Sequence, residues 1–235
     1  MSTYINPYTD FGFKKLFGEE ASKDLLIDFL NAILPAHHQI AELSFQNAEN
    51  LPDTSNERKA LFALHCQSAN GEQFIVEIQK ADMKHFKDRL IYYISFPIRD
   101  QAQREDRGFK PKDIYSISIL DFFYETDKDN ATFYRCIGLK DQYNNVFYNN
   151  LQMYCLQMPA FKKSDRELES HFDKWAFFLK NLESFDSIPQ ILKEPIFEQA
   201  FDTALLANLD REQMQEYERS RLSYIGIREA IKTAE

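Results

Sequence analysis

Glycine, proline and cysteine are all scarce in this sequence of 235 residues. It holds 6 glycines and 8 prolines, which excludes collagen-like and low-complexity chains. Its three cysteines, Cys66, Cys136 and Cys155, are far apart and form no CxxC pair, so neither a disulfide framework nor a structural zinc site is expected. The apolar runs are too short to cross a bilayer, and no signal-like leader opens the chain. We therefore expect a cytoplasmic protein with reduced thiols and no membrane segment.

Negative charge dominates, which does not suggest nucleic-acid binding. Lys and Arg total 28 against 37 Asp and Glu, for a net charge of −9. Residues 80–113 are the exception, with nine basic and six acidic side chains and a net charge of +3. This segment is either a solvated helix face of mixed charge or a surface for phosphate groups. No glycine-rich phosphate loop is present, so no nucleotide cofactor is expected.

Hydrophobic residues make up 44% of the chain, enough to bury the core of one sizeable domain. Apolar spacing predicts helices over residues 10–17, with Asp10 as N-cap, and 25–34, then a weak strand at 41–45 and a helix over 82–103 that Pro97 bends or interrupts. Further strands are predicted at 114–124, 132–139 and 146–158, and helices at 165–182, 194–208 and 211–234. The pattern indicates an α/β core followed by a helical region.

A β-hairpin is the clearest local signal, and its loop decides which side chains meet. Strands at 61–66 and 74–79 flank a turn that contains Asn70-Gly71. A two-residue loop sets Leu64 opposite Glu77. A three-residue loop with a left-handed Gly71 sets Leu64 opposite Val76 instead. Only the three-residue loop gives one wholly apolar face, and we predict that register.

This register places Ala63 directly opposite Glu77, with Gln79 on the same face of the hairpin. Cross-strand partners lie within about 5 Å, so an acidic residue at position 63 would complete a two-carboxylate pocket for Mg²⁺. The sequence has alanine there. Without further information, Glu77 reads as an ordinary solvent-facing strand glutamate.

The hairpin closely resembles the core motif of the PD-(D/E)XK nuclease family transposases, also called recombination-promoting nucleases. That motif is an apolar-Asp-apolar strand, a glycine turn, and Val-Glu-apolar-Gln, which here reads Val76-Glu-Ile-Gln79. The resemblance extends in order over nearly the whole chain. It includes Asp10-Phe-Gly-Phe-Lys14 near the start, Arg89-x-x-Tyr92-Tyr93 after the hairpin, and Tyr217-Glu-Arg-Ser near the end. Relatives usually continue beyond the equivalent of residue 235, so we expect a missing C-terminal tail.

The resemblance implies a restriction-endonuclease-like fold and metal-dependent hydrolysis of DNA. The family's Asp and Glu bind Mg²⁺, with Mn²⁺ or another divalent ion as a substitute, and the carbonyl after the Glu, here that of Ile78, often joins them. Gln79 stands where many nucleases of the wider superfamily have lysine. Its neutral amide can orient water or phosphate but cannot act as a base.

Ala63 is the departure from the family pattern, because it stands where the metal-binding Asp is expected. The loss of one of two anionic ligands should weaken a Mg²⁺ site severely. The remaining motif residues Glu77 and Gln79 are intact, which fits either a deliberate Asp→Ala substitution or natural inactivation. We predict that the chain as written is nearly inactive as a nuclease. The alternative is a non-catalytic DNA-binding or protein-interaction member of the same fold.

Other candidate residues follow from the basic segment and from the faces of the hairpin. DNA-binding candidates are Lys80, Lys84, Lys87, Arg89, Tyr93 and His65. Asp10 could supply an acidic group to the outer shell of the metal. We expect a nuclease-like core at residues 1–160 and a helical region at 161–235, packed on the core or used for self-association. A homodimer is expected by analogy only.

Overall fold

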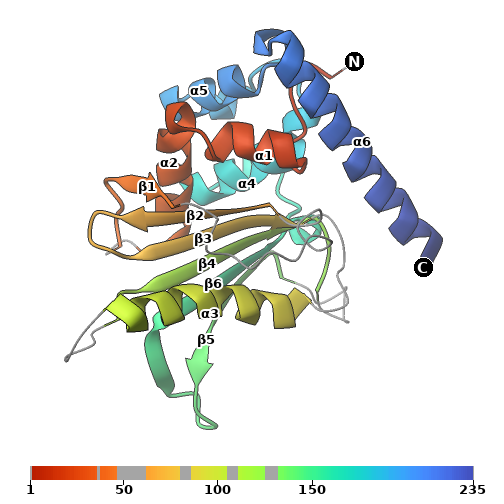
Figure 1. The fold of residues 1–235 in the computed structure, drawn as a ribbon. Coiled ribbons are helices and arrows are strands. Elements are labelled where there is room, and N and C mark those ends of the chain that lie inside the picture. Colours follow the sequence, from red (N-terminus) through yellow and green to blue (C-terminus); the bar gives the residue numbers. More distant parts are fainter. Residues whose placement is uncertain are drawn as a thin grey trace. The chain divides into compact units, whose positions relative to one another are not determined.

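The computed structural model divides into two compact units, which are described separately. It describes residues 2–35, 38–46, 62–79, 86–104, 111–124 and 132–234. One unit joins residues 1–41 to residues 161–235, and the other comprises residues 42–160 (Figure 1). The expected division into a nuclease-like core at residues 1–160 and a helical region at residues 161–235 stays a prediction.

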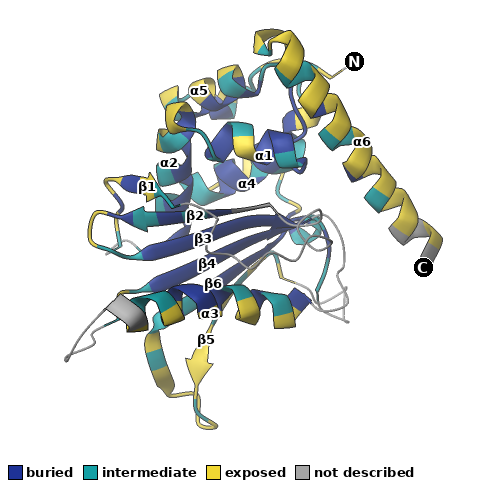
Figure 2. Ribbon diagram, viewed as in Figure 1, coloured by how far each residue is buried: buried dark blue, intermediate teal, exposed yellow. Residues whose placement is uncertain are grey.

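The second unit is built on a mixed six-stranded sheet of order β1-β2-β3-β4-β6-β5. Its strands are β1 (Leu43–Phe45), β2 (Phe62–Ser68), β3 (Gln73–Gln79), β4 (Ile114–Leu120), β5 (Tyr134–Lys140) and β6 (Val146–Gln157). The three central strands β3, β4 and β6 run parallel, and the outer pairs are antiparallel. Figure 2 shows β3 and β4 as buried along their length and β5 as mostly exposed.

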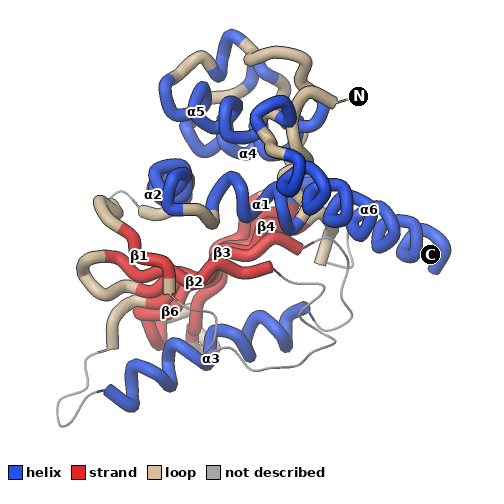
Figure 3. The backbone as a smooth tube through the Cα atoms, turned by 45° about the horizontal axis from the view of Figure 1, so that its top comes forward, coloured by secondary structure: helices blue, strands red, loops and turns tan. Residues whose placement is uncertain are grey.

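Helix α3 (Phe86–Arg104) joins the parallel strands β3 and β4 and runs along one face of the sheet (Figure 3). Phe86, Leu90 and Ile94 recur every four residues on one side of the helix, and they pack with sheet residues such as Ile75 and Met153. This packing buries the apolar stripe that the sequence predicted. The helix continues through Pro97 without a break.

The β2–β3 hairpin has the register predicted from its sequence. Leu64 pairs with Val76, and Ala63 pairs with Glu77. The loop closes with a hydrogen bond of 2.9 Å from the Ser68 N–H to the Glu72 carbonyl. Gly71 has a φ of 87°, the left-handed conformation that the three-residue loop requires. The prediction of the loop and of the pairing is therefore confirmed.

The first unit is helical and draws its helices from both ends of the chain. They are α1 (Asp10–Phe17), α2 (Lys23–Ile33), α4 (His171–Asn181), α5 (Pro195–Ala204) and α6 (Arg211–Ala234). Trp175 is fully buried against the rings of Phe17, Phe29 and Phe197. Its indole Nε1 donates to Asp28 Oδ1 at 2.6 Å, which ties α4 to α2.

The start of α1 corrects one prediction. The N-cap is Thr9, whose hydroxyl accepts from the Gly12 N–H at 2.9 Å, and Asp10 is the first helical residue. Threonine and aspartate both cap helices well. Here the helix begins one residue earlier than expected, so the Thr9 hydroxyl occupies the capping position. Among the described residues, no helix is both long and apolar enough to cross a membrane.

Candidate active site

One line of cross-strand partners crosses the sheet from β2 to β5 and forms the centre of the candidate site. It consists of positions 63, 77, 118, 155 and 135, which we call the Glu77 row. Cys155 belongs to the core cluster that also contains α3 residues, so the row shares the face that α3 covers. Alternation along each strand therefore directs Glu77 and Gln79 toward the α3 side.

The carboxyl group of Glu77 is buried and held at one of its two oxygens. Glu77 is 1% exposed. The Ser118 hydroxyl donates to Oε1 at 2.5 Å, and the Gln79 Nε2 donates to the same atom at 3.0 Å. No described residue donates a hydrogen bond to Oε2. The described residues therefore fix the orientation of the side chain through one oxygen and donate no hydrogen bond to the other.

Burial is the main influence on the proton affinity of this group. Loss of solvent raises the pKa of Glu77 above its usual range, and the hydrogen bonds from Ser118 and Gln79 and the positive charge of Arg89 oppose that effect. Burial, with the nearby Glu77 charge, raises the pKa of the Cys155 thiol to about 12. Cys155 therefore stays a neutral thiol at physiological pH. Glu77 is the one residue of the row with a carboxyl group.

Gln79 carries a second unused oxygen next to Glu77. The side chain is 1% exposed, and its Oε1 is buried with no hydrogen-bond donor in the part of the chain that the structure describes. Its Nε2 donates to Glu77, which sets the orientation of the amide. A buried acceptor without a partner costs free energy, so such atoms commonly mark a place for a ligand or water.

These atoms provide part of a divalent-metal site. Mg²⁺ prefers oxygen ligands in near-octahedral geometry, with carboxylates as its usual protein anchors. Glu77 Oε2 and Gln79 Oε1 are of the right type, but alanine at position 63 offers no oxygen. Among the described residues, Glu77 belongs to no group of three potential metal-binding side chains. The donor set therefore fits a divalent ion incompletely.

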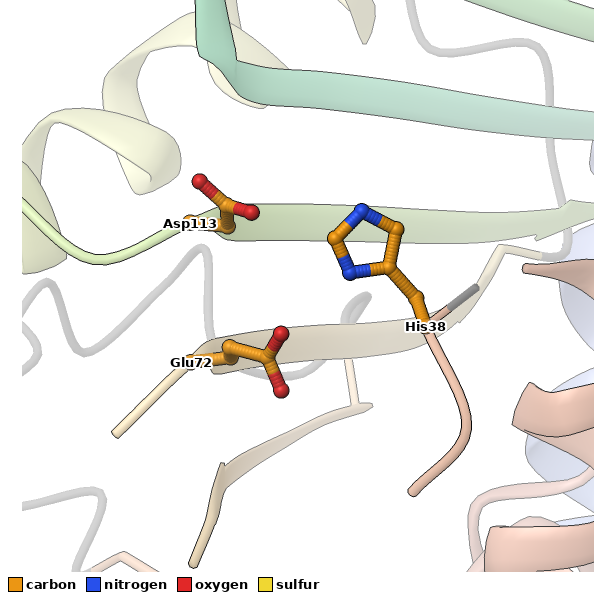
Figure 4. Close-up of side chains that lie close together, drawn as sticks. All are labelled: His38, Glu72 and Asp113. Carbon is orange, nitrogen blue, oxygen red and sulfur yellow. The ribbon is translucent and has the colours of Figure 1, made fainter. Parts of the chain in front are cut away.

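A different acidic pair lies at the opposite ends of the same strands and was not predicted. Glu72 precedes β3 and Asp113 precedes β4 (Figure 4). Glu72 accepts from the Ser68 hydroxyl at 2.9 Å, and Asp113 accepts from the Asn150 amide at 2.6 Å. These bonds give both carboxylates structural partners. His38, which Figure 4 draws with them, belongs to the other unit, and we assign it no part in this pair.

The predicted DNA-binding side chains on α3 lie close to one another. The Arg89 guanidinium carbon is 6.0 Å from the centre of the Tyr93 ring, one helical turn away, as the spacing predicted. Lys87 is exposed, with its ammonium 5.4 Å from the Tyr124 ring centre. The Nε and Nη2 atoms of Arg89 are buried. Only part of this guanidinium is therefore open to a phosphate group in the present arrangement.

The remaining predicted site residues differ in how far the structure describes them. The His65 Nε2 forms a hydrogen bond of 2.9 Å with the Gln73 side chain. Ile78 lies between Glu77 and Gln79 on β3, so its carbonyl belongs to the same strand segment. Asp10 belongs to the other unit, and its part in a metal shell stays a prediction. Lys80 and Lys84 lie outside the described residues.

Sequence reasoning missed Ser118, Cys155 and Arg135, which complete the Glu77 row. These residues come from strands that align with β3 through parallel pairing or through a further antiparallel strand. No short turn sets the register of these strands, so no local sequence pattern predicts it. The only signal was the β-rich character of the segments themselves.

Comparison with known proteins identifies the family of this chain. The sequence model of the PD-(D/E)XK nuclease family transposases matches residues 7–234. No curated protein and no solved structure gives a significant match. The mixed sheet with flanking helices is the α/β architecture expected of the restriction-endonuclease-like fold. Because the match covers nearly the whole chain, this protein belongs to the PD-(D/E)XK nuclease family transposases.

Proposed function

We propose that this chain is a DNA endonuclease that depends on a divalent metal ion, and that Ala63 leaves it nearly inactive. The observation that carries the proposal is the pairing of position 63 with the buried, oriented Glu77. The unused oxygens of Glu77 and Gln79 support it, because they are the atoms a hard cation would take. Mg²⁺ is the proposed ion, and Mn²⁺ a substitute.

Each residue of the site has a distinct role in this proposal. Glu77 Oε2, Gln79 Oε1 and the Ile78 carbonyl would hold the ion, with a carboxylate at position 63 as the missing ligand. When bound, the ion supplies Lewis-acid polarisation of the phosphate and lowers the pKa of an attacking water. Gln79 donates to Glu77 and orients it. Its neutral amide cannot take the proton from the water.

Contact with DNA is proposed through the basic segment of α3 and the residues before it. Lys87 is exposed, and Arg89 and Tyr93 lie one helical turn apart. Phosphate contacts by such side chains position the duplex without reading its sequence. We therefore expect affinity for DNA to fall steeply as salt rises, because bound counterions are released.

A non-catalytic member that binds DNA or a protein is the second candidate, and alanine at position 63 is the observation that favours it. Natural loss of the carboxylate would remove catalysis, while the fold and the basic segment could still serve for binding. Self-association as a homodimer and a cytoplasmic location stay predictions.

Nicking of supercoiled plasmid in Mg²⁺ or Mn²⁺ separates the two candidates. The chain as it stands is compared with Ala63→Asp, and Ala63→Asn serves as a control of similar size without the charge. We expect the Asp variant to nick at least about a hundredfold faster, because it regains an anionic ligand. The double variant Ala63→Asp/Glu77→Gln should lose that gain.

One outcome would contradict the role assigned to position 63, and another would contradict the nuclease activity itself. Equal cleavage by the unaltered chain and the Asp variant would show that position 63 has no part in the chemistry. Cleavage by neither protein, with DNA bound by both at low salt, would favour the non-catalytic binding module.

A further inference from the structure

Ser118 is the closest hydrogen-bonding partner of Glu77 and lies on a different strand. It is fully buried at the middle of β4, directly opposite Glu77 in the parallel β3–β4 pair. Its hydroxyl donates to Glu77 Oε1 at 2.5 Å, a short contact of the kind made to a charged acceptor. The hydroxyl proton is therefore committed to one oxygen of the carboxyl group.

The two donors around Glu77 converge on the same atom. Gln79 also donates to Oε1, at 3.0 Å, and no described residue donates to Oε2. A carboxyl group on a flexible side chain can turn about its last bond, and its plane is then not fixed. Two donors from two strands that meet at one oxygen hold that plane, so the other oxygen points in one direction.

We propose that Ser118 is a positioning residue that holds Glu77 Oε1 so that Oε2 is presented to the divalent ion. This role rests on the proposed nuclease function and deepens it, because it names a residue beyond the sequence motif on which metal affinity depends. Outer-sphere partners of this type orient metal ligands, and their loss typically weakens metal binding about 10- to 100-fold. Without Ser118, Gln79 is the single remaining donor to the carboxyl group among the residues that the structure describes.

Ser116 offers a matched control on the same strand and the same face. It lies two residues before Ser118, is also fully buried, and pairs with Ile75 rather than with Glu77. Its hydroxyl oxygen has no hydrogen-bond partner among the residues that the structure describes. Ser116→Ala therefore removes the same atom from the same environment without any contact to the carboxyl group.

The test measures binding of Mn²⁺ alone, by electron paramagnetic resonance titration of the Ala63→Asp protein. Adding Ser118→Ala should raise the dissociation constant about 10- to 100-fold, and adding Ser118→Thr, which keeps the hydroxyl, should restore most of the affinity. Adding Ser116→Ala should leave the constant unchanged. Equal affinity with and without the Ser118 hydroxyl would overturn the inference, as would an equal loss in the Ser116 variant.

A second measurement distinguishes failure of this inference from failure of the proposed function. In the chain as it stands, urea unfolding of Glu77→Met, Ser118→Ala and the double variant reports whether the two side chains interact. We expect the two losses of stability to be clearly less than additive. Strict additivity would overturn the positioning role whatever the metal does. A third result is also decisive: the two side chains interact, but the Ala63→Asp protein binds no Mn²⁺. That result would overturn the proposed function and, with it, the role of Ser118 in metal binding.

Discussion

At the scale of single residues, the buried carboxyl group of Glu77 shapes both stability and chemistry. Ionisation of a group under α3 is costly because water is excluded, and burial raises its pKa accordingly. A divalent ion competes with the proton for the same oxygen, so metal binding should strengthen as pH rises. The ionised Glu77 therefore lowers the stability of the folded protein at neutral pH, and the same carboxylate is what can bind a cation.

Glu77→Gln tests that cost directly. Because the pKa of Glu77 is raised, the folded protein binds this proton more tightly than the unfolded chain does. The protein with Glu77 therefore loses stability as pH rises from 4.5, the pKa in the unfolded chain, through the pKa in the folded state. We expect the Gln variant to be more stable than the parent by about 1–2 kcal/mol at pH 7.5. The difference should shrink as pH falls toward 4.5. Urea unfolding at several pH values measures it, and a constant difference would contradict the account.

The same residues show how much of the site could be predicted from sequence. The pairing of Ala63 with Glu77 followed from a short loop, because the loop length alone sets the register of a hairpin. Ser118 comes from a strand 41 residues away from Glu77 in the chain, and its alignment depends on the packing of α3 between the two strands. A nonlocal parallel register leaves no local pattern in the sequence.

At the scale of elements, the β2–β3 hairpin places position 63 and Glu77 opposite each other. Its three-residue loop ends in Gly71 with a φ of 87°, and the pairing then runs without a slip from Gln67–Gln73 to Phe62–Ile78. A shift by one residue would turn Glu77 away from the α3 side of the sheet. The loop conformation is therefore a condition for the site.

Gly71→Ala should weaken the hairpin without a steric clash. A methyl group there would lie 3.4 Å from Lys112 Cγ, an ordinary contact, so the cost comes from the left-handed backbone. We expect a loss of about 1–2 kcal/mol in the free energy of unfolding. Gly138→Ala on β5 is the matched control, since nothing lies within 4 Å and no positive φ is required there. Equal losses in the two variants would refute this account of the loop.

The helices could be predicted in kind but not in detail. Apolar spacing located α1, α2, α3, α5 and α6 to within a few residues. The expected helix over 165–182 is in fact a single 3₁₀ turn followed by α4, which starts only after the Ser170 cap. Ser170 accepts from the Asp173 N–H at 3.0 Å, and this capping bond fixes the start of the helix. A choice among several neighbouring capping residues depends on geometry that the sequence does not show.

At the scale of the whole molecule, the chain returns its C-terminal segments to its N-terminal helices. Asp28 on α2 accepts from Trp175 on α4, and Tyr4 forms a β-bridge with Leu205. Residues 1–41 group with residues 161–235 rather than with the sheet. Sequence spacing located each helix without showing which helices pack together, because the apolar faces of α1 and α2 fit several partners.

The central claim is that a carboxylate at position 63 and the oriented Glu77 together bind a divalent ion. The most direct test is a crystal structure of the Ala63→Asp protein grown with Mn²⁺, with the ion located by its anomalous scattering. The account predicts a single strong peak in direct contact with Glu77 Oε2 and with the carboxylate introduced at position 63. A peak beside Glu72 and Asp113, or no peak near Glu77 at saturating Mn²⁺, would contradict it.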